Sequence, residues 1–442
     1  MIRQYHHKQK IIQLVENNTL ENSTNVFSIL VGKNGTGKST FLGNLTTEFI
    51  KESKNKRKNS LFEQYSFDNP FPSQIISVST SPFDKFPIDR FEKESNYTYL
   101  GLRDLHSSNF GLAYLSKIIA SLIESVSKEP RQAYEIGRVL DYLGYQDVIL
   151  IGFQLFQSRR FLEEILETKE PVEFLFQQNS VFSRRISRSF FLNKDESFSE
   201  RKIYKLKEIA EKILTKDLYR SNFELILDKN GVNINYQESE DILFLIQAGI
   251  LKLKDVKLQS NKDYSFFSIK DASSGEQSII LSILGIASKI KDNSLVCIDE
   301  PEICLHPQWQ EKYIEILIKT FEQYKNCHFI IATHSPQIIS KLANVNSFII
   351  DMETGNIKNA TEFINHSADY QLANIFDSPG FKNEYLSRIA LNIFSKVSSK
   401  KSFDEDDKTK LKLIEKQSQY LEINDPVYDL YITLKKLFDI YG

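Results

Sequence analysis

A glycine-rich segment near the N-terminus constrains the fold of this chain more than any other feature. Residues 32–39 read Gly-Lys-Asn-Gly-Thr-Gly-Lys-Ser and match the pattern G-x-x-x-x-G-K-[ST] at every fixed position. The apolar residues 27–31 before it favour a buried strand, and residues 38–53 after it favour a helix. Glycines let backbone N–H groups turn inward, and the helix N-terminus attracts anions. The segment therefore predicts an α/β fold with a phosphate-binding loop.

Two side chains of this loop have specific expected roles. Lys38 should reach the β- and γ-phosphates of a bound nucleotide, and the Ser39 hydroxyl should ligate Mg²⁺. The residues that we expect to bind ATP here are Gly32, Lys33, Asn34, Gly35, Thr36, Gly37, Lys38, Ser39 and Thr40.

Two carboxylates follow a second apolar stretch. Residues 295–298 favour a buried strand, and Asp299 and Glu300 come directly after it. Ligands of parallel α/β sheets bind at the carboxyl ends of the strands. Asp299 is therefore a candidate Mg²⁺ ligand, and Glu300 is a candidate base for an attacking water molecule.

His334 follows a further apolar strand, at residues 328–333. A lone histidine is most often a structural or surface residue. Here the strand should end at the same edge of the sheet as the one that precedes Asp299. We therefore expect His334 to contact the γ-phosphate and count it, with Glu300 and Lys38, among the catalytic residues.

The segment Ser-Ser-Gly-Glu-Gln at residues 273–277 favours the start of a helix. Ser274 is the predicted N-cap, with Gln277 completing a capping-box pattern. The segment is either a capped helix and nothing more, or a second anion site at a helix N-terminus, formed by Ser274 and Gly275.

Composition excludes some classes of protein, and the sequence divides into four kinds of segment. The 442 residues carry 56 Lys and Arg against 58 Asp and Glu, which excludes a globally basic nucleic-acid coat and an acidic disordered tail. We predict a tail interrupted by a charged linker at residues 396–410. The predicted segments are 1–105 and 221–380 for the two parts of one α/β domain that carries these motifs, 106–220 for a mainly helical insertion, and 381–442 for a helical C-terminal tail.

Targeting signals are not evident. The first ten residues contain no apolar stretch, and the longest apolar stretch, at residues 279–290, is too short to span a bilayer. The 3 cysteines are too few for a secreted disulfide framework. We therefore expect a cytoplasmic protein without a membrane partner.

The four motifs follow one another along the chain at residues 32–39, 273–277, 299–300 and 334. In this chain order they resemble the motifs of ABC-type ATPase heads. In that family two heads pair head to tail, and ATP lies between the Walker A loop of one and the signature motif of the other. The matching residues are 32–40 for Walker A, Asp299 and Glu300 for Walker B, His334 for the switch histidine, and Ser274 and Gly275 for the signature. Ser273 and Glu276 depart from the usual LSGGQ, which favours the soluble SMC/RecF/OLD-like branch over transporters.

The residues after Walker B narrow the resemblance. ATPases from prokaryotic anti-phage systems have an E-P-E-x-x-L-H-P-x-x-Q element after Walker B, and the residues that match it here are Glu302, His306, Pro307 and Gln310. Residues 79–87 match a second stretch of the same ATPases. That group is the OLD-like, Septu PtuA and retron-associated ATPases. The resemblance implies ATP and Mg²⁺ as cofactors and a head-to-tail dimer or a higher oligomer. It also implies a sensor or regulatory role over a separate effector nuclease, for which the HNH type is one candidate.

Some expected features have no firm residue. The Q-loop glutamine has no match, because Thr80 and Ser81 end the strand that should precede it. Tyr5 is a candidate for the aromatic residue that stacks on adenine. DNA or retron nucleic acid is a further candidate partner because arginines alternate with aromatics in residues 182–194, although aromatics in a core with arginines on the surface would read the same. The residues concerned are Phe182, Arg184, Arg185, Arg188, Phe190 and Phe191.

Three other functions stay open at this point. A DNA repair or recombination ATPase of the SMC/RecF kind would be stimulated by DNA without a protein partner. A transporter subunit would need a membrane partner. A nucleotide-locked scaffold would bind ATP and turn it over very slowly, against which Glu300 argues.

Overall fold

The computed structural model describes most of the chain, in two units. The described residues are 2–7, 10–16, 24–55, 71–88, 96–103, 110–129, 131–155, 158–176, 186–193, 197–216, 222–234, 239–342 and 346–442. The first unit comprises Met1–Ile75, Ser79–Pro87 and Asp292–Gly442. The second comprises Ile76–Val78 and Ile88–Lys291. The strand β4 (Ile75–Ser79) therefore contributes to both.

A mainly parallel sheet forms the centre of the first unit. Its strands that lie wholly in this unit are β3 (Val26–Val31), β11 (Leu295–Asp299), β12 (His328–Ala332), β13 (Ser347–Asp351) and β14 (Ile357–Asn359). They lie in the order β14–β13–β3–β12–β11, with β14 antiparallel to β13 and the other neighbours parallel. All residues of β3, β11 and β12 are buried, as the continuous apolar runs of the sequence predict for strands covered on both faces.

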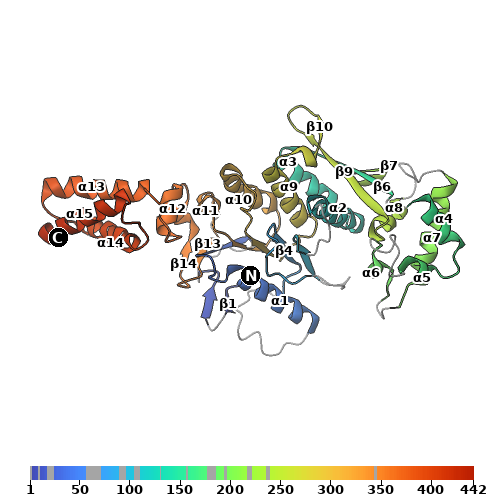
Figure 1. Ribbon diagram of the computed structural model, residues 1–442, viewed down its shortest axis with the longest axis horizontal. Helices are drawn as coiled ribbons and strands as arrows, with labels where there is room; N and C mark the ends of the chain where they lie inside the picture. The colour runs from blue at the N-terminus through green and yellow to red at the C-terminus, as the bar shows by residue number, and fades with distance from the viewer. Residues whose placement is uncertain are drawn as a thin grey trace. The chain divides into compact units, whose positions relative to one another are not determined.

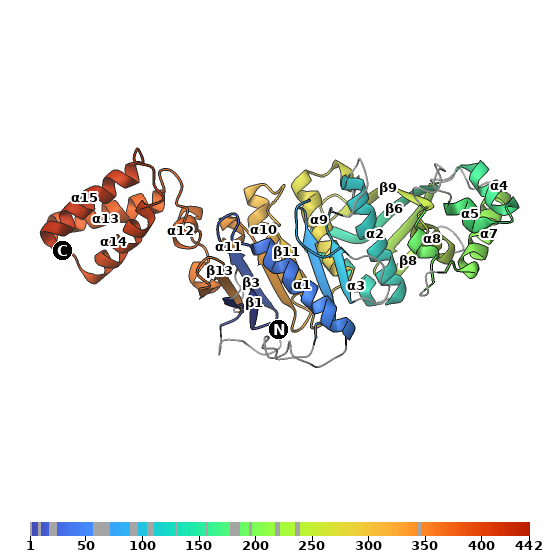
Figure 2. The same cartoon turned by 60° about the horizontal axis from the view of Figure 1, so that its bottom comes forward.

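Helices cover both faces of these strands. In Figures 1 and 2, α1 (Lys38–Asn55) and α10 (Pro307–Phe321) lie on opposite sides of the sheet. The ring of Phe329 stacks on Phe27, with 4.8 Å between centroids, and on Phe321 of α10, at 5.8 Å. Further short elements here are α11 (Pro336–Ser340), α12 (Ala368–Asn374), and the hairpin of β1 (Gln4–His7) and β2 (Lys10–Gln13).

A buried histidine joins the N-terminal segment to this sheet. The backbone N–H of Ile2 donates to Nδ1 of His328 at 3.2 Å, so Nε2 must carry the proton of a neutral imidazole. Nε2 lies 2.8 Å from the Ser28 hydroxyl, which itself donates to the carbonyl of Leu14 at 2.6 Å. Burial lowers the pKa of His328 from 6.5 to about 3. The folded state therefore holds this imidazole neutral.

This histidine predicts how stability depends on pH. Below pH 6.5 the unfolded chain binds a proton that the folded chain excludes, so protonation favours unfolding as the pH falls toward the folded pKa of about 3. We expect the free energy of unfolding to lose up to about 1.4 kcal/mol per pH unit below 6.5 through this one group. Chemical denaturation at pH 7.5, 6 and 5 should give a shallower loss for His328→Gln, and an unchanged one for His6→Gln, whose side chain is exposed. Equal slopes for all three proteins would contradict this assignment.

Three helices end the chain and pack on one another. They are α13 (Glu384–Lys400), α14 (Glu405–Ser418) and α15 (Pro426–Tyr441), and Figure 1 shows them side by side. Their shared core includes Ile393, Ile414 and Leu434. The helical tail was predicted, but the charged linker at residues 396–410 was wrong, because helix covers most of that range.

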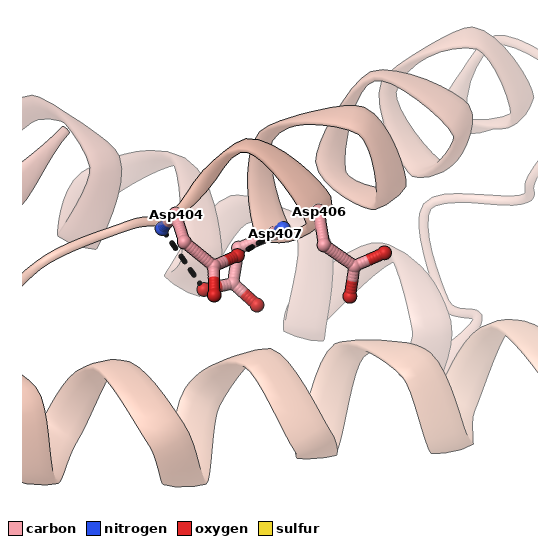
Figure 3. Close-up of side chains that lie close together, drawn as sticks. All are labelled: Asp404, Asp406 and Asp407. Carbon is pink, nitrogen blue, oxygen red and sulfur yellow. Dashed lines mark hydrogen bonds between the residues drawn. The ribbon is translucent and has the colours of Figure 1, made fainter.

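Ion pairs explain why this charged stretch folds. Asp404 and Asp407 form a reciprocal capping box that starts α14, with N–H to carboxylate distances of 2.9 and 3.1 Å (Figure 3). The Lys396 ammonium bonds to both carboxylates across the turn. The carboxylates of Asp404, Asp406 and Asp407 gather within 4.8 Å. Because a cap and a lysine already engage two of them, the cluster has a structural explanation.

The second unit contains an antiparallel sheet with helices around it. Its strands are β6 (Tyr145–Leu155), β7 (Asn222–Asp228), β8 (Gly231–Ile234), β9 (Leu251–Ser260) and β10 (Phe266–Ser268), in the order β10–β9–β6–β7–β8. Strand β5 (Tyr97–Leu100) and the following helices complete it: α2 (Phe110–Lys128), α3 (Arg131–Tyr142), α4 (Arg159–Glu167), α5 (Pro171–Phe176), α6 (Arg188–Phe191), α7 (Glu200–Thr215), α8 (Ser239–Gln247) and α9 (Ser274–Ala287). Helices α2–α7 fall within residues 106–220, where the mainly helical insertion stays a prediction, and β6, the middle strand of this sheet, was not predicted. Among the described helices, none combines the length and apolar character of a membrane span.

Candidate nucleotide site

Three strand ends meet in register at one edge of the first unit's sheet. Asp299 pairs with Ala332, which in turn pairs with Leu30. The loops that follow these three residues therefore start side by side. They contain the glycine-rich loop, Glu300 and His334, so the structure brings together the groups that the sequence placed at a common edge.

The glycine-rich loop has the backbone that its glycines permit. Gly32, Gly35 and Gly37 have φ values of +143°, +85° and +96°, which other residues rarely adopt. A Cβ on Gly32 would also lie 3.1 Å from the Thr36 hydroxyl. Helix α1 starts at Lys38, so its free N–H groups face the loop. This arrangement is suited to a phosphate.

Lys38 is folded back onto this loop. Its ammonium donates to the carbonyls of Gly32 at 2.7 Å and Lys33 at 3.2 Å, and the residue is only 5% exposed. Burial lowers the pKa of Lys38, and the nearby Glu300 and Glu302 oppose that shift. The loop thus holds a cation whose protein partners are neutral carbonyls, which a phosphate oxygen can replace.

Ser39 and Asp299 form a pair of oxygen ligands. The Ser39 hydroxyl donates to Oδ1 of Asp299 at 3.1 Å, and Asp299 is 2% exposed. Burial raises the pKa of Asp299 to about 7, against the effect of the Ser39 hydrogen bond. Hydroxyl and carboxylate oxygens in this arrangement fit Mg²⁺, which prefers hard oxygen ligands.

Glu300 and His334 face each other beside the lysine. Glu300 has a left-handed backbone, with φ +49°, and its N–H donates to the carbonyl of Ala332 at 2.9 Å. Oε1 of Glu300 lies 3.9 Å from Nε2 of His334, and both side chains are about one-third exposed. Burial, and then the Lys38 charge, lower the pKa of His334 to about 4. The imidazole is therefore neutral at pH 7, and solvent can reach both side chains.

Glu302 was matched by resemblance but had no predicted role. Its Oε1 accepts a hydrogen bond of 2.5 Å from the backbone N–H of His334. The signal that singled it out was the E-P-E element. Sequence alone could not identify its partner, which is a main-chain group that belongs to another strand–loop unit.

Two further contacts reach the second residue of the glycine-rich loop. The backbone N–H of Lys33 donates to Oε1 of Glu353 at 3.1 Å. The Lys33 ammonium lies 4.1 Å from the ring centroid of Tyr420, which follows α14. Neither partner was predicted, since no motif marks them.

Asp84, in the resembling stretch 79–87, is 2% exposed and raises the pKa of Asp299 through its charge, as one of the smaller contributions.

The signature segment lies in the second unit, at the start of α9. The N-cap is Ser273, whose side chain accepts from the N–H of Glu276, so the predicted cap at Ser274 was wrong by one residue. Accordingly Gln277 does not complete a capping box; its amide instead donates to the carbonyls of Lys270 and Ala272. Ser274 itself is exposed at the helix N-terminus.

Three aromatic candidates are core residues. Tyr5 is 1% exposed and packs edge-on against Phe41 at 5.1 Å, so its ring has no free face for adenine. Phe190 and Phe191 are buried against Phe244, which leaves them unable to stack on bases. Of the other residues proposed there, Arg188 is exposed, and Phe182, Arg184 and Arg185 lie outside the described residues.

Comparisons with known proteins find similarity over parts of the chain. The family model described as "AAA domain, putative AbiEii toxin, Type IV TA system" matches residues 157–340, which include the signature, Walker B and switch segments. A retron Ec83 probable ATPase of Escherichia coli is 32% identical over 126 residues, covering 25% of this chain and 23% of that protein. A retron Vc95 probable ATPase of Vibrio cholerae serotype O1 biovar El Tor is 26% identical over 172 residues, or 32% of each chain.

These relatives match over a limited part of their length. The chain spans between 23% and 32% of the two retron proteins. Among solved structures, an Smc head bound to the C-winged helix domain of ScpA aligns over 81% of this chain and 96% of its own, at 14% identity and a TM-score of 0.27. That TM-score is too low to support an argument. The sequence matches and the loop geometry together support a P-loop domain that is similar to parts of retron probable ATPases.

Proposed function

We propose that this chain is a magnesium-dependent ATPase that works as a dimer and regulates a separate effector nuclease in anti-phage defence. The observation that carries the proposal is the meeting of the glycine-rich loop, Asp299, Glu300 and His334 at one strand edge. The retron ATPases to which the chain is similar, and its E-P-E element, support the defence role.

The loop residues bind the triphosphate in this proposal. The Lys38 ammonium exchanges the carbonyls of Gly32 and Lys33 for oxygens of the β- and γ-phosphates. Ser39 and Asp299 would hold Mg²⁺, which supplies charge neutralisation to the phosphates when bound. The backbone N–H groups at the start of α1 complete the cradle.

Glu300 and His334 act on the γ-phosphate. Glu300 accepts a proton from water as the water oxygen attacks the γ-phosphorus, and the bond to the β-phosphate oxygen breaks, which yields ADP and phosphate. His334 is neutral at pH 7, so one ring N–H can donate to a γ-phosphate oxygen as charge moves. The 3.9 Å between Nε2 of His334 and Oε1 of Glu300 leaves both groups within reach of one water molecule.

Dimerisation supplies the signature segment in this proposal. Ser274 is exposed at the N-terminus of α9, where a partner's γ-phosphate would meet free N–H groups of Ser274 and Gly275. We expect Ser274→Arg to lower steady-state ATP hydrolysis at least about tenfold, because the long side chain blocks the partner's approach to these groups. ATP affinity should change less than about twofold. Ser398→Arg, at an exposed position of α13, is the matched control.

The regulatory role has its own test. A tagged Glu300→Gln form is recovered from its native host with ATP and Mg²⁺, and co-purifying protein and nucleic acid are identified by mass spectrometry and sequencing. Lys38→Ala, prepared in parallel, shows which partners need bound ATP. A stoichiometric nuclease or reverse transcriptase supports the defence role. A membrane permease would replace it by transport, and DNA without a protein partner would replace it by repair.

A further inference from the structure

Glu302 connects the loops that follow two neighbouring strands. It belongs to the turn after β11, only two residues beyond Glu300. Its Oε1 accepts from the N–H of His334, in the loop after β12, at 2.5 Å. Glu302 thus ties the main chain at His334 to the turn that carries Glu300. The contact fixes the main chain at the switch histidine.

Burial makes the Glu302 carboxyl energetically costly. Its Oε2 is buried and has no hydrogen-bond partner among the described residues. Burial raises the pKa of Glu302, and the N–H of His334 is the largest opposing influence. A buried carboxyl is costly to keep unless hydrogen bonds stabilise it, and the Thr333 side chain acts in the same direction as the His334 N–H. An apolar side chain at this position would avoid the cost of burying a carboxyl. The hydrogen bond to the His334 N–H therefore explains why a carboxyl is present.

A second contact anchors the next residue of the same loop. The Ser335 hydroxyl donates to Oε1 of Gln310 at 2.6 Å, and the Gln310 amide donates to the carbonyl of Leu305 at 2.9 Å. Gln310 lies on α10, in the same E-P-E-x-x-L-H-P-x-x-Q element as Glu302. The side chains of Glu302 and Gln310 therefore accept hydrogen bonds from two consecutive residues, His334 and Ser335.

We propose that Glu302 is a positioning residue for ATP hydrolysis, which, together with Gln310, holds His334 at its working distance from Glu300. The inference rests on the proposed function, since it assigns the E-P-E element a task in that reaction. Among the described residues, the 2.5 Å hydrogen bond of the Glu302 side chain goes to His334 and not to the phosphate-binding loop. Its loss should therefore affect the chemical step more than ATP binding, because a displacement of about 1 Å at a catalytic group can cost about a hundredfold in rate.

Hydrogen exchange tests the contact directly, without relying on activity. In Glu302→Ala, we expect the amide of His334 to exchange at least about tenfold faster, while amides within β11 and β12 keep their protection. Glu302→Gln retains an acceptor oxygen and should keep exchange at His334 within about threefold of the original protein. Glu311→Ala, at an exposed position of α10, is the matched control.

Kinetics of the same proteins complete the test. We expect kcat of Glu302→Ala to fall between about tenfold and a hundredfold, with the Kd for ATP within about threefold, and Glu302→Gln to recover most of the loss. Unchanged exchange at His334, or an unchanged kcat in Glu302→Ala, would overturn the proposal, and so would loss of protection throughout both strands. If the original protein hydrolyses no ATP, the proposed function fails while the exchange measurement still reports on the contact.

Discussion

Replacement of Glu300 by glutamine should lower kcat about 10²- to 10⁴-fold and leave ATP binding almost intact. A glutamine amide has the shape of the carboxylate but cannot accept the proton of the attacking water, and general bases contribute about that range of rate. The contact of this residue with Ala332 is made by its backbone N–H, which the substitution keeps. Steady-state phosphate release and equilibrium binding of ATP, both with Mg²⁺, measure the two effects separately.

The dimer gives this variant a second readout. If the signature segment of a partner closes the site, a protein that binds ATP without cleaving it should accumulate as a dimer in size-exclusion chromatography with light scattering. Glu311→Gln, whose side chain is exposed, should behave like the original protein in both assays. Hydrolysis by Glu300→Gln at the normal rate would remove Glu300 from the role of base. A very slow original protein that matches its variant would instead favour the nucleotide-locked scaffold.

Motifs with local mechanisms were predictable from the sequence. The glycine-rich loop, the apolar strand before Asp299 and the strand before His334 each have a short-range signature, and parallel strands end at a common edge. The register of Leu30, Ala332 and Asp299 confirms that edge. Their roles in binding and catalysis stay predictions until they are tested.

Features that depend on distant partners were not predictable in the same way. The Lys396 ammonium bonds to two aspartates beyond a turn, so a stretch that looks like a charged linker is folded as helix. Helix capping was predicted in kind but not in position, since two adjacent serines both suit an N-cap and only the geometry selects Ser273. The grip of Glu302 on His334 needs two strands in register before it exists.

Strand β6 was missed for a different reason. It lies between two helical segments, and its apolar residues at positions 148–151 are as compatible with a buried helix as with a strand. Its alternating burial becomes visible only once β7 and β9 pair on either side. A turn glycine at position 144, with φ +89°, and the β-branched residues that follow were the available signals.

Removal of the Lys38 ammonium should weaken ATP binding about 10- to 100-fold. A hydrogen bond to a charged group contributes about 1.5–3 kcal/mol, and each 1.4 kcal/mol is tenfold in affinity. The loss should lie toward the upper end, because Asp299, Glu300 and Glu302 surround Lys38 and would then face the triphosphate without their cation. Isothermal titration calorimetry of Lys38→Ala with ATP and Mg²⁺ measures the change in affinity for ATP.

A lysine on the same helix separates this effect from general damage to α1. Lys51 is exposed toward the other end of α1, so Lys51→Ala removes an equal charge far from the loop and should bind ATP with unchanged affinity. Both variants should also keep the thermal stability of the original protein to within a few degrees, because among the described residues the Lys38 ammonium donates to loop carbonyls that water can satisfy. An ATP affinity of Lys38→Ala equal to that of Lys51→Ala would mean that the triphosphate does not bind at the glycine-rich loop, and the assignments of Ser39, Asp299 and Glu300 would fall with it.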